Sequence, residues 1–232
     1  MKSESLPPST LEKLRAFSTC VVASAIEVFG IRLPNVGFAN SSVKCRFPDL
    51  ASVVGFAVTA RIRSSDPPME GKNYYHRPDW WEHIQKMPAP RIVVIEDTDK
   101  PPGLGAFVGE VHANILAALG CVAVVTNGAV RDIREVRAAG FQMFSGNVSV
   151  SHAYAHIFDF GGTVTVGELK VGPGDLIHGD LNGVLNVPTE LAARIPDVAA
   201  GIVEKRRSLV EVCRSREFSL AHLRQAAQEV KS

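Results

Sequence analysis

Residues 120–132 read GCVAVVTNGAVRD, and this segment decides how the rest of the chain is interpreted. Cys121 to Val125 are continuously apolar and mostly β-branched, a pattern typical of a strand that is buried on both faces. We expect the strand to end in a turn at Thr126-Asn127-Gly128, because Asn and Gly tolerate positive φ. A helical pattern then follows Arg131 and Asp132. These two residues are therefore expected at the carboxyl end of a buried strand, where open α/β sheets tend to bind ligands.

Length and composition are those of an ordinary globular protein. The chain has 232 residues, of which 46% are hydrophobic and 21% charged, enough for one domain with a sizeable core. Lys plus Arg total 25 and Asp plus Glu total 24, so no basic surplus indicates a nucleic-acid partner. The N-terminus lacks the apolar run of a signal peptide, and no window of about 18 apolar residues indicates a membrane span. We expect a cytoplasmic protein with neither a nucleic-acid nor a membrane partner.

Alternating strand and helix patterns predict a single α/β domain over residues 1–232, with helices outside a mixed sheet. Before the 120–132 segment we expect strands over 53–63 and 91–96, a glycine-rich loop over 103–110 and a helix over 111–119. After it we expect β segments over 141–145, 152–160 and 163–166, a hairpin across Asn182-Gly183, and helices over 188–195, 198–213 and 220–230.

Residues 64–90 form a Pro-rich and aromatic excursion between two of these strands. It contains Tyr74, Tyr75, Trp80 and Trp81, and one short helix is expected near 80–86. Such a cluster can line a site or contact another subunit, and an ordinary packing role fits the sequence equally well.

Several other motifs fail as functional signatures. Gly103, Gly105 and Gly109 give G-x-G-x-x-x-G, which differs from the dinucleotide-binding spacing. His152 and His156 fall in a region that reads as β, where they would lie about 13 Å apart, too far to share one metal ion. The four cysteines form no Cys-x-x-Cys pair, which argues against a cysteine zinc site and a disulfide framework.

The glycine-rich loop and the Arg-Asp pair together suggest a site for an anion and a metal ion. Amides at Gly109, Glu110 and Val111 are expected at a helix N-terminus, which favours a substrate carboxylate. Mg²⁺ often uses only one or two protein carboxylates, so Asp132 can bind it directly and Glu110 directly or through water. Arg131 would hold an anionic oxygen through two hydrogen bonds. A plain ion pair, with a Glu that favours the helix dipole, is the alternative.

Four segments resemble, in order, the motifs of one family: GEV at 109–111, NGAVRD at 127–132, PGD at 173–175 and DLNGV at 180–184. This is the RraA-like family, which joins the regulator of ribonuclease activity A proteins to the 4-hydroxy-4-methyl-2-oxoglutarate (HMG) aldolases. The resemblance covers about residues 10–215 and leaves 216–232 as a C-terminal helix. It implies a compact α/β sandwich similar to swivelling phosphohistidine domains, assembled as homotrimers or homohexamers with sites at subunit interfaces.

The resemblance also implies roles for individual residues. Asp132 would bind Mg²⁺ or Mn²⁺, and Arg131 would contact the substrate and the developing enolate. The amides of Gly109 to Val111 would hold the pyruvyl carboxylate, and the Glu110 side chain would bind metal-bound water. A further acid would come from the C-terminal helix of a neighbouring subunit, where Glu204 is the nearest match.

Two residues depart from the family pattern. Asn127 stands where an Asp is common, and Glu110 stands where the studied aldolases have an Asp. Both departures bear on the identity of the substrate more than on metal binding.

These observations lead to the hypothesis of a class II, metal-dependent lyase. It would cleave the C3–C4 bond of a small 2-oxo acid, by retro-aldol cleavage of HMG or decarboxylation of oxaloacetate, and leave a pyruvate enolate. Arg131 and the divalent metal would stabilise the enolate charge. The alternative is a protein-binding regulator of ribonuclease activity without catalysis.

Overall fold

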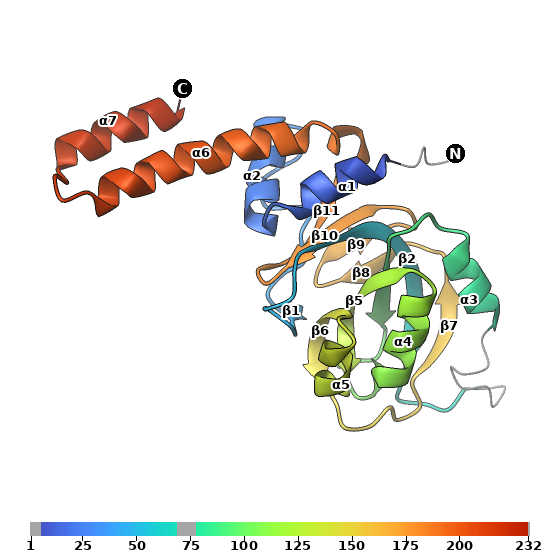
Figure 1. Cartoon of the computed structure of the whole chain (residues 1–232). Helices are drawn as coiled ribbons and strands as arrows, with labels where there is room; N and C mark the ends of the chain where they lie inside the picture. The colour runs from blue at the N-terminus through green and yellow to red at the C-terminus, as the bar shows by residue number, and fades with distance from the viewer. Residues whose placement is uncertain (1–5, 69–77, 232) are drawn as a thin grey trace.

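The computed structural model describes residues 6–68 and 78–231. They form a mixed β-sheet covered by helices, from which a helical hairpin projects at one end (Figure 1). This arrangement confirms the expected α/β class with a mixed sheet flanked by helices. Tyr74 and Tyr75 lie outside the described residues.

The centre of the sheet is parallel and its flanks are antiparallel. Among the described residues the strand order is β1-β6-β5-β3-β2-β10-β11, with β4 paired to β5 and β7 paired to β2. The strands are β1 (Lys44–Cys45), β2 (Val53–Arg63), β3 (Arg91–Asp97), β4 (Ala106–Val108), β5 (Cys121–Val130), β6 (Gln142–Val148), β7 (His156–Phe160), β10 (Leu176–Asp180) and β11 (Gly183–Val187). Because β2, β3, β5, β6 and β4 run parallel, their carboxyl ends meet at one edge.

Most of the helices and one β-hairpin cover the two faces of this sheet. The helices are α1 (Pro8–Arg15), α2 (Thr19–Val28), α3 (Pro78–Gln85), α4 (Glu110–Ala118), α5 (Ile133–Ala138), α6 (Ile195–Arg214) and α7 (Leu220–Lys231). Side chains of α3, α4 and α5 share one hydrophobic cluster with β3 and β5, while the hairpin of β8 (Val164–Val166) and β9 (Leu169–Val171) packs on the opposite face. Trp80 of α3 is 1% exposed, so it belongs to this core.

The turn expected at 126–128 is wrong. β5 runs on to Val130, and its pairing with β6 shifts register between Thr126 and Ala129. Asn127 stays in the strand because its side chain is hydrogen-bonded to the backbone of Asp97, at the end of β3. Asn and Gly therefore support a β-bulge here, one of the irregularities that these residues allow besides a turn.

Three other expectations change. The glycine-rich passage contains a short strand, β4, because its backbone pairs with the extended end of β5. The β segment expected over 152–160 begins only at His156. The helix expected over 188–195 is a single 3₁₀ turn, Thr189–Leu191, followed by α6. The C-terminal helix expected over 220–230 is confirmed as α7.

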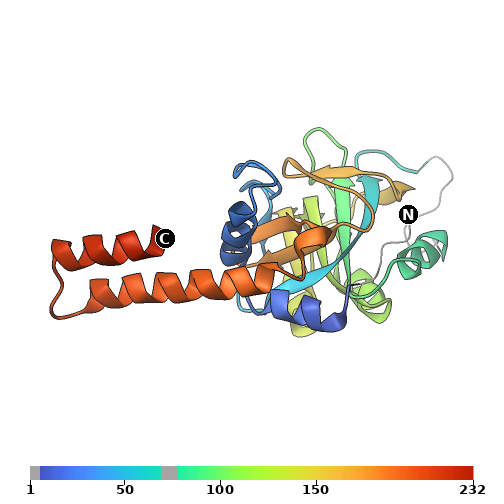
Figure 2. The same cartoon turned by 90° about the horizontal axis from the view of Figure 1, so that it is seen from above.

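The helical hairpin of α6 and α7 extends away from the sheet (Figure 2). At about 1.5 Å per residue, the 20 residues of α6 span about 30 Å. Its first turns bury Ile195 and Ala199 against α1 and α2, whereas its later residues are mostly exposed. Within the part of the chain that the structure describes, no helix is long and apolar enough to cross a membrane.

Candidate functional site

Residues from two segments of the chain meet at the carboxyl ends of β4 and β5. Asp132 Oδ2 accepts a hydrogen bond of 2.9 Å from the backbone N–H of Glu110. Arg131 Nε lies 3.4 Å from the same oxygen. The side chains of Arg131 and Asp132 are 29% and 34% exposed, so both are accessible from solvent. The structure thus brings the Arg131 and Asp132 side chains to the backbone N–H of Glu110, the third residue that the sequence singled out.

The parallel pairing of β4 with β5 places these segments side by side. Ala106 pairs with Ala129 and Val108 with Val130, and the backbone N–H of Arg131 donates to Val108 O at 3.0 Å. Each strand then turns directly into a helix, α4 after β4 and α5 after Arg131 and Asp132. The start of α4 therefore lies beside the start of α5.

Gly109 lies where these two chain segments come closest. A Cβ atom at this position would overlap Asp132 Oδ2 and would lie 2.9 Å from Arg131 Cγ. The φ of Gly109 is −134°, which other residues also adopt, so space and not backbone conformation requires glycine here. The sequence indicated the Gly109 amide but not this steric reason.

Asp132 has an unusual backbone conformation, with φ 54° and ψ 48°. Left-handed residues other than glycine are uncommon, and Asp is among the residue types that tolerate this region. Asp132 stands at the N-cap position of α5, yet its side chain does not bond α5 and instead bonds the first residue of α4. Strained residues of this kind cluster at functional sites.

The N-terminus of α4 offers donors to an anion. Gly109 is the N-cap of α4 and supplies no side-chain cap. The first N–H groups of a helix have no intrahelical acceptor, so after Glu110 N is engaged by Asp132, the N–H of Val111 is the next in line. The helix dipole adds partial positive charge at the same place.

A buried histidine supports this turn from inside, and the sequence did not single it out. His112 is 2% exposed, and its Nδ1 lies 3.2 Å from Phe107 O. The two rings also pack edge to face, with centroids 4.4 Å apart. Burial lowers the pKa of His112 to about 4, so the imidazole is neutral at pH 7.

Asp97 and Asn127 tie the neighbouring strand ends together. Asn127 Oδ1 accepts from Asp97 N at 2.8 Å, and Asn127 Nδ2 donates to Asp97 O at 2.9 Å. The Asp97 carboxylate accepts from Gly103 N at 2.8 Å, and its burial raises its pKa above the ordinary value. Asp97 was also missed, although an acid directly after a buried strand is a recognisable signal. Asn127, which departs from the family pattern, thus links the ends of β3 and β5.

Glu204 does not reach this site within one chain. It lies on α6, its side chain is 66% exposed, and it pairs with Arg207 at 2.8 Å. Figures 1 and 2 show that α6 projects away from α4 and α5. Glu204 can therefore approach an Asp132 only in another copy of the chain.

The side chains at the site suit Mg²⁺ better than Zn²⁺. Over residues 6–68 and 78–231, no group of three or more His, Cys, Asp or Glu side chains is arranged to hold a metal ion. A zinc-type site built from three or four protein ligands is therefore not formed by these residues. Mg²⁺ commonly uses one or two carboxylates and completes its shell with water and substrate oxygens. Asp132 with Glu110 fits that requirement.

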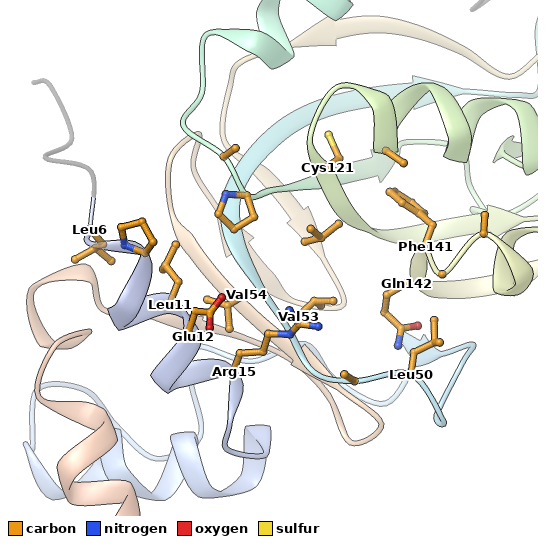
Figure 3. Close-up of a pocket in the computed structure, with 18 residues that line it drawn as sticks. Leu6, Leu11, Glu12, Arg15, Leu50, Val53, Val54, Cys121, Phe141 and Gln142 are labelled. Atoms are coloured by element: carbon orange, nitrogen blue, oxygen red, sulfur yellow. The ribbon is translucent and has the colours of Figure 1, made fainter.

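A separate cavity of about 490 Å³ lies at the opposite edge of the sheet (Figure 3). Val53 and Cys121, which begin β2 and β5, line it together with Leu11 and Arg15 of α1. None of the predicted site residues lines it. Burial raises the pKa of the Cys121 thiol to about 12, so this cysteine is not an activated nucleophile.

Comparison with known proteins gives a consistent result. The family model "RraA-like: Aldolase/RraA" matches residues 19–186. A protein of Halalkalibacterium halodurans named "Putative 4-hydroxy-4-methyl-2-oxoglutarate aldolase" is 29% identical over 137 residues, which are 59% of this chain. The match spans 60% of that relative's length.

Two solved structures share the fold over nearly the whole chain. An uncharacterized protein from Pseudomonas syringae pv. tomato str. DC3000 has a TM-score of 0.75 and 20% identity, and the match covers 99% of this chain and 97% of the other. Streptomyces coelicolor RraAS2, named an unusual member of the RNase ES inhibitor RraA protein family, has a TM-score of 0.68 and 19% identity. That match covers 88% of this chain and 97% of the other.

Proposed function

Because the chain belongs to the RraA-like family, we propose that it is a divalent-metal-dependent lyase. Its substrate is a small 2-oxo acid whose C3–C4 bond is cleaved, either HMG by retro-aldol cleavage or oxaloacetate by decarboxylation. One observation carries the proposal: Asp132 Oδ2 is shared between Arg131 Nε and the amide of Glu110, at the adjacent carboxyl ends of β4 and β5. A cation, an anion-binding helix terminus and a carboxylate thereby meet in one exposed place.

The substrate carboxylate is assigned to the turn at the start of α4. Of the three amides that the sequence indicated, Glu110 N already donates to Asp132, so Gly109 and Val111 are left for the substrate. The positive end of the α4 dipole favours a carboxylate there. The Arg131 guanidinium stands beside this turn and is assigned to the 2-oxo oxygen.

Mg²⁺ or Mn²⁺ is assigned to Asp132, with Glu110 as a direct ligand or one that acts through water. When bound, the ion supplies positive charge that draws electrons toward the 2-oxo group. Arg131 stabilises the same negative charge as the C3–C4 bond breaks, and one such group commonly contributes about 3 kcal/mol.

The aldol and decarboxylation reactions differ in their need for a base. Retro-aldol cleavage requires removal of the proton from the 4-hydroxyl, and a water molecule polarised by the exposed carboxylate of Glu110 is assigned to accept it. Decarboxylation of oxaloacetate releases CO₂ without such a proton transfer. In both reactions the pyruvate enolate then takes up one proton from solvent at C3 to become pyruvate. Oxaloacetate is therefore the less demanding substrate for this site.

We assign a second copy of the chain to the solvent-exposed side of Arg131 and Asp132. Arg131 and Asp132 are about one third exposed, and the α6–α7 hairpin carries Glu204 away from its own body. We infer a homotrimer or homohexamer in which this hairpin brings an acid such as Glu204 to the neighbouring site.

The family description also includes RraA, so a protein-binding regulator of ribonuclease activity is the alternative. The likeness to Streptomyces coelicolor RraAS2 lies at 19% identity and supports the shared fold alone. The tight arrangement of Arg131, Asp132 and Gly109 favours the lyase.

The test is pyruvate release by the purified full chain from HMG and from oxaloacetate. We expect release that depends on Mg²⁺ or Mn²⁺, stops with EDTA and is lost in Asp132→Asn. A control without protein, at the same metal concentration, corrects for decarboxylation by the metal ion alone. Release that is unchanged by EDTA and by Asp132→Asn would overturn the lyase. No release from either substrate, together with capture of a ribonuclease by the chain, would favour the regulator.

A further inference from the structure

His112 closes a hydrogen-bonded ring around the turn that carries the proposed carboxylate-binding amides. Its Nδ1 lies 3.2 Å from Phe107 O, so the bond joins the last residue but one of β4 to the third residue of α4. The enclosed residues, 108–111, are those that pass from the strand to the helix terminus. Since a carbonyl oxygen only accepts, the imidazole must donate from Nδ1.

The turn is held from both sides. On its outer side, Asp132 Oδ2 accepts from Glu110 N, and Arg131 N donates to Val108 O. On its inner side, the imidazole of His112 bonds Phe107 O, immediately before the turn, and His112 is 2% exposed. Phe107 packs against the imidazole ring and is equally buried. The direction of the Val111 N–H is thereby set by partners on both faces of the turn.

We propose that His112 is a positioning residue of the site: its bond to Phe107 O holds the amides of Gly109 and Val111 in the orientation that binds the carboxylate of a 2-oxo acid. The assignment of the ligand rests on the proposed function. The claim that the His112–Phe107 bond holds the turn rests only on the geometry. His112 does not touch the ligand in this scheme, because its ring points into the core.

The chain offers a matched control in a second buried histidine. His178 of β10 is 0% exposed, and its Nε2 lies 3.2 Å from Leu14 O, so it makes the same kind of bond. It pairs with Val54 at the amino end of β2, whereas the site lies at the carboxyl ends of the parallel strands. Loss of the bond at His178 therefore affects the fold without affecting the turn.

Three variants separate positioning from stability. His112→Phe keeps a ring in the core and removes the donor, while His112→Asn keeps a donor near the Nδ1 position. His178→Phe removes the equivalent bond far from the site. Equilibrium unfolding in urea shows whether His112→Phe and His178→Phe lose comparable stability, so that their other properties are compared on equal terms.

Two measurements test the proposal. Hydrogen exchange of peptides that cover residues 106–113 needs no ligand, and we expect at least tenfold faster exchange in His112→Phe than in the wild type or His178→Phe. Calorimetric titration with oxalate at fixed Mg²⁺ uses a mimic of the carboxylate and adjacent oxygen of an enolate. We expect about tenfold weaker binding in His112→Phe, near-normal binding in His112→Asn and no change in His178→Phe.

The outcomes distinguish this proposal from the proposed function. If the wild type does not bind oxalate, the lyase assignment loses support, and the exchange experiment alone decides whether His112 holds the turn. If hydrogen exchange at 106–113 is the same in His112→Phe and His178→Phe, His112 does not hold the turn, whatever the chain binds. If the chain proves active, KM should rise in His112→Phe with little change in kcat, since a carboxylate anchor binds ground and transition states alike.

Discussion

The carboxylate of Asp132 caps the helix that begins with Glu110 and not the helix that it precedes. Its Oδ2 accepts from Glu110 N at 2.9 Å, whereas α5, which follows Asp132, receives no side-chain cap. The Asp132 side chain therefore makes a structural hydrogen bond and, in the proposed function, also binds the metal ion. Any test of the site must separate these two contributions.

Two substitutions of Asp132 make this separation. Asp132→Asn keeps an oxygen that can accept from Glu110 N, so its free energy of unfolding should stay close to that of the wild type. Asp132→Ala removes the cap and should lose about 1 kcal/mol. Both should lose metal-dependent pyruvate release, because neither carries a charge for the ion. Urea unfolding and pyruvate assays of both variants provide the check, and full activity in Asp132→Asn would contradict the assigned role.

Gly109→Ala should damage the site through steric overlap. Its Cβ would overlap Asp132 Oδ2 and press on Arg131, so both side chains must move from the positions they hold at the site. We expect a loss of about 1–3 kcal/mol in stability and at least a tenfold fall in activity. The matched control is Gly201→Ala in α6, where an added Cβ meets no atom within 4 Å and stability should rise by about 0.5–1 kcal/mol. Equal stability of the two variants would show that the Asp132 and Arg131 side chains leave room for a methyl group at Gly109.

Asn127→Asp should destabilise the protein. A carboxylate cannot donate to Asp97 O, and it adds negative charge beside the buried carboxyl of Asp97. We expect a loss of about 1–3 kcal/mol, larger at pH 8 than at pH 5. Asn114→Asp removes a comparable bond, to Glu110 O, at an exposed position and should change stability by less than about 0.5 kcal/mol. Urea unfolding of both variants at the two pH values measures the difference.

His178 should make the protein less stable in mild acid. Burial lowers its pKa, although the carbonyls of Leu14 and Phe17 and the charge of Asp180 act in the opposite direction. A lowered native pKa means that the unfolded chain binds the proton more readily than the folded one. The stabilising contribution is therefore complete above the unfolded value of about 6.5 and is lost as the pH falls from there toward the native pKa.

The His178 effect is isolated by comparing the wild type with His178→Gln, whose amide can still donate to Leu14 O. The unfolding free energy should fall between pH 8 and pH 5 in both proteins, because other groups such as His112 also titrate. The fall should be smaller in His178→Gln. An equal fall in the two proteins would mean that His178 does not titrate differently on folding.

Local patterns in the sequence predicted most of the elements that position the site. The apolar run at Cys121 marked a buried strand, and Arg131 and Asp132 were expected at its carboxyl end, as the structure has them. The helix after Gly109 was expected at 111–119 and lies at Glu110–Ala118. These predictions succeeded because burial and helix periodicity act over a few neighbouring residues, which the sequence displays directly.

Long-range pairing decided the details that the sequence left open. The extension of β5 through Asn127 depends on two hydrogen bonds to Asp97, 30 residues earlier. The short strand β4 depends on β5 for its partner. Neither feature produces a periodic pattern in the local sequence. The Asn127-Gly128 pair alone therefore predicted a turn.

By itself, then, the sequence determined the α/β class, the buried strand that begins at Cys121 and the helix that follows Gly109, and it singled out Glu110, Arg131 and Asp132 as candidates for one site. Only the tertiary structure decided that Asp132 Oδ2 bonds Glu110 N, that Gly109 must lack a side chain, and that His112 supports the turn from the core. The physical reason is that hydrogen bonds and steric contacts between segments depend on how strands are paired. Residue type and spacing along the chain do not specify that pairing.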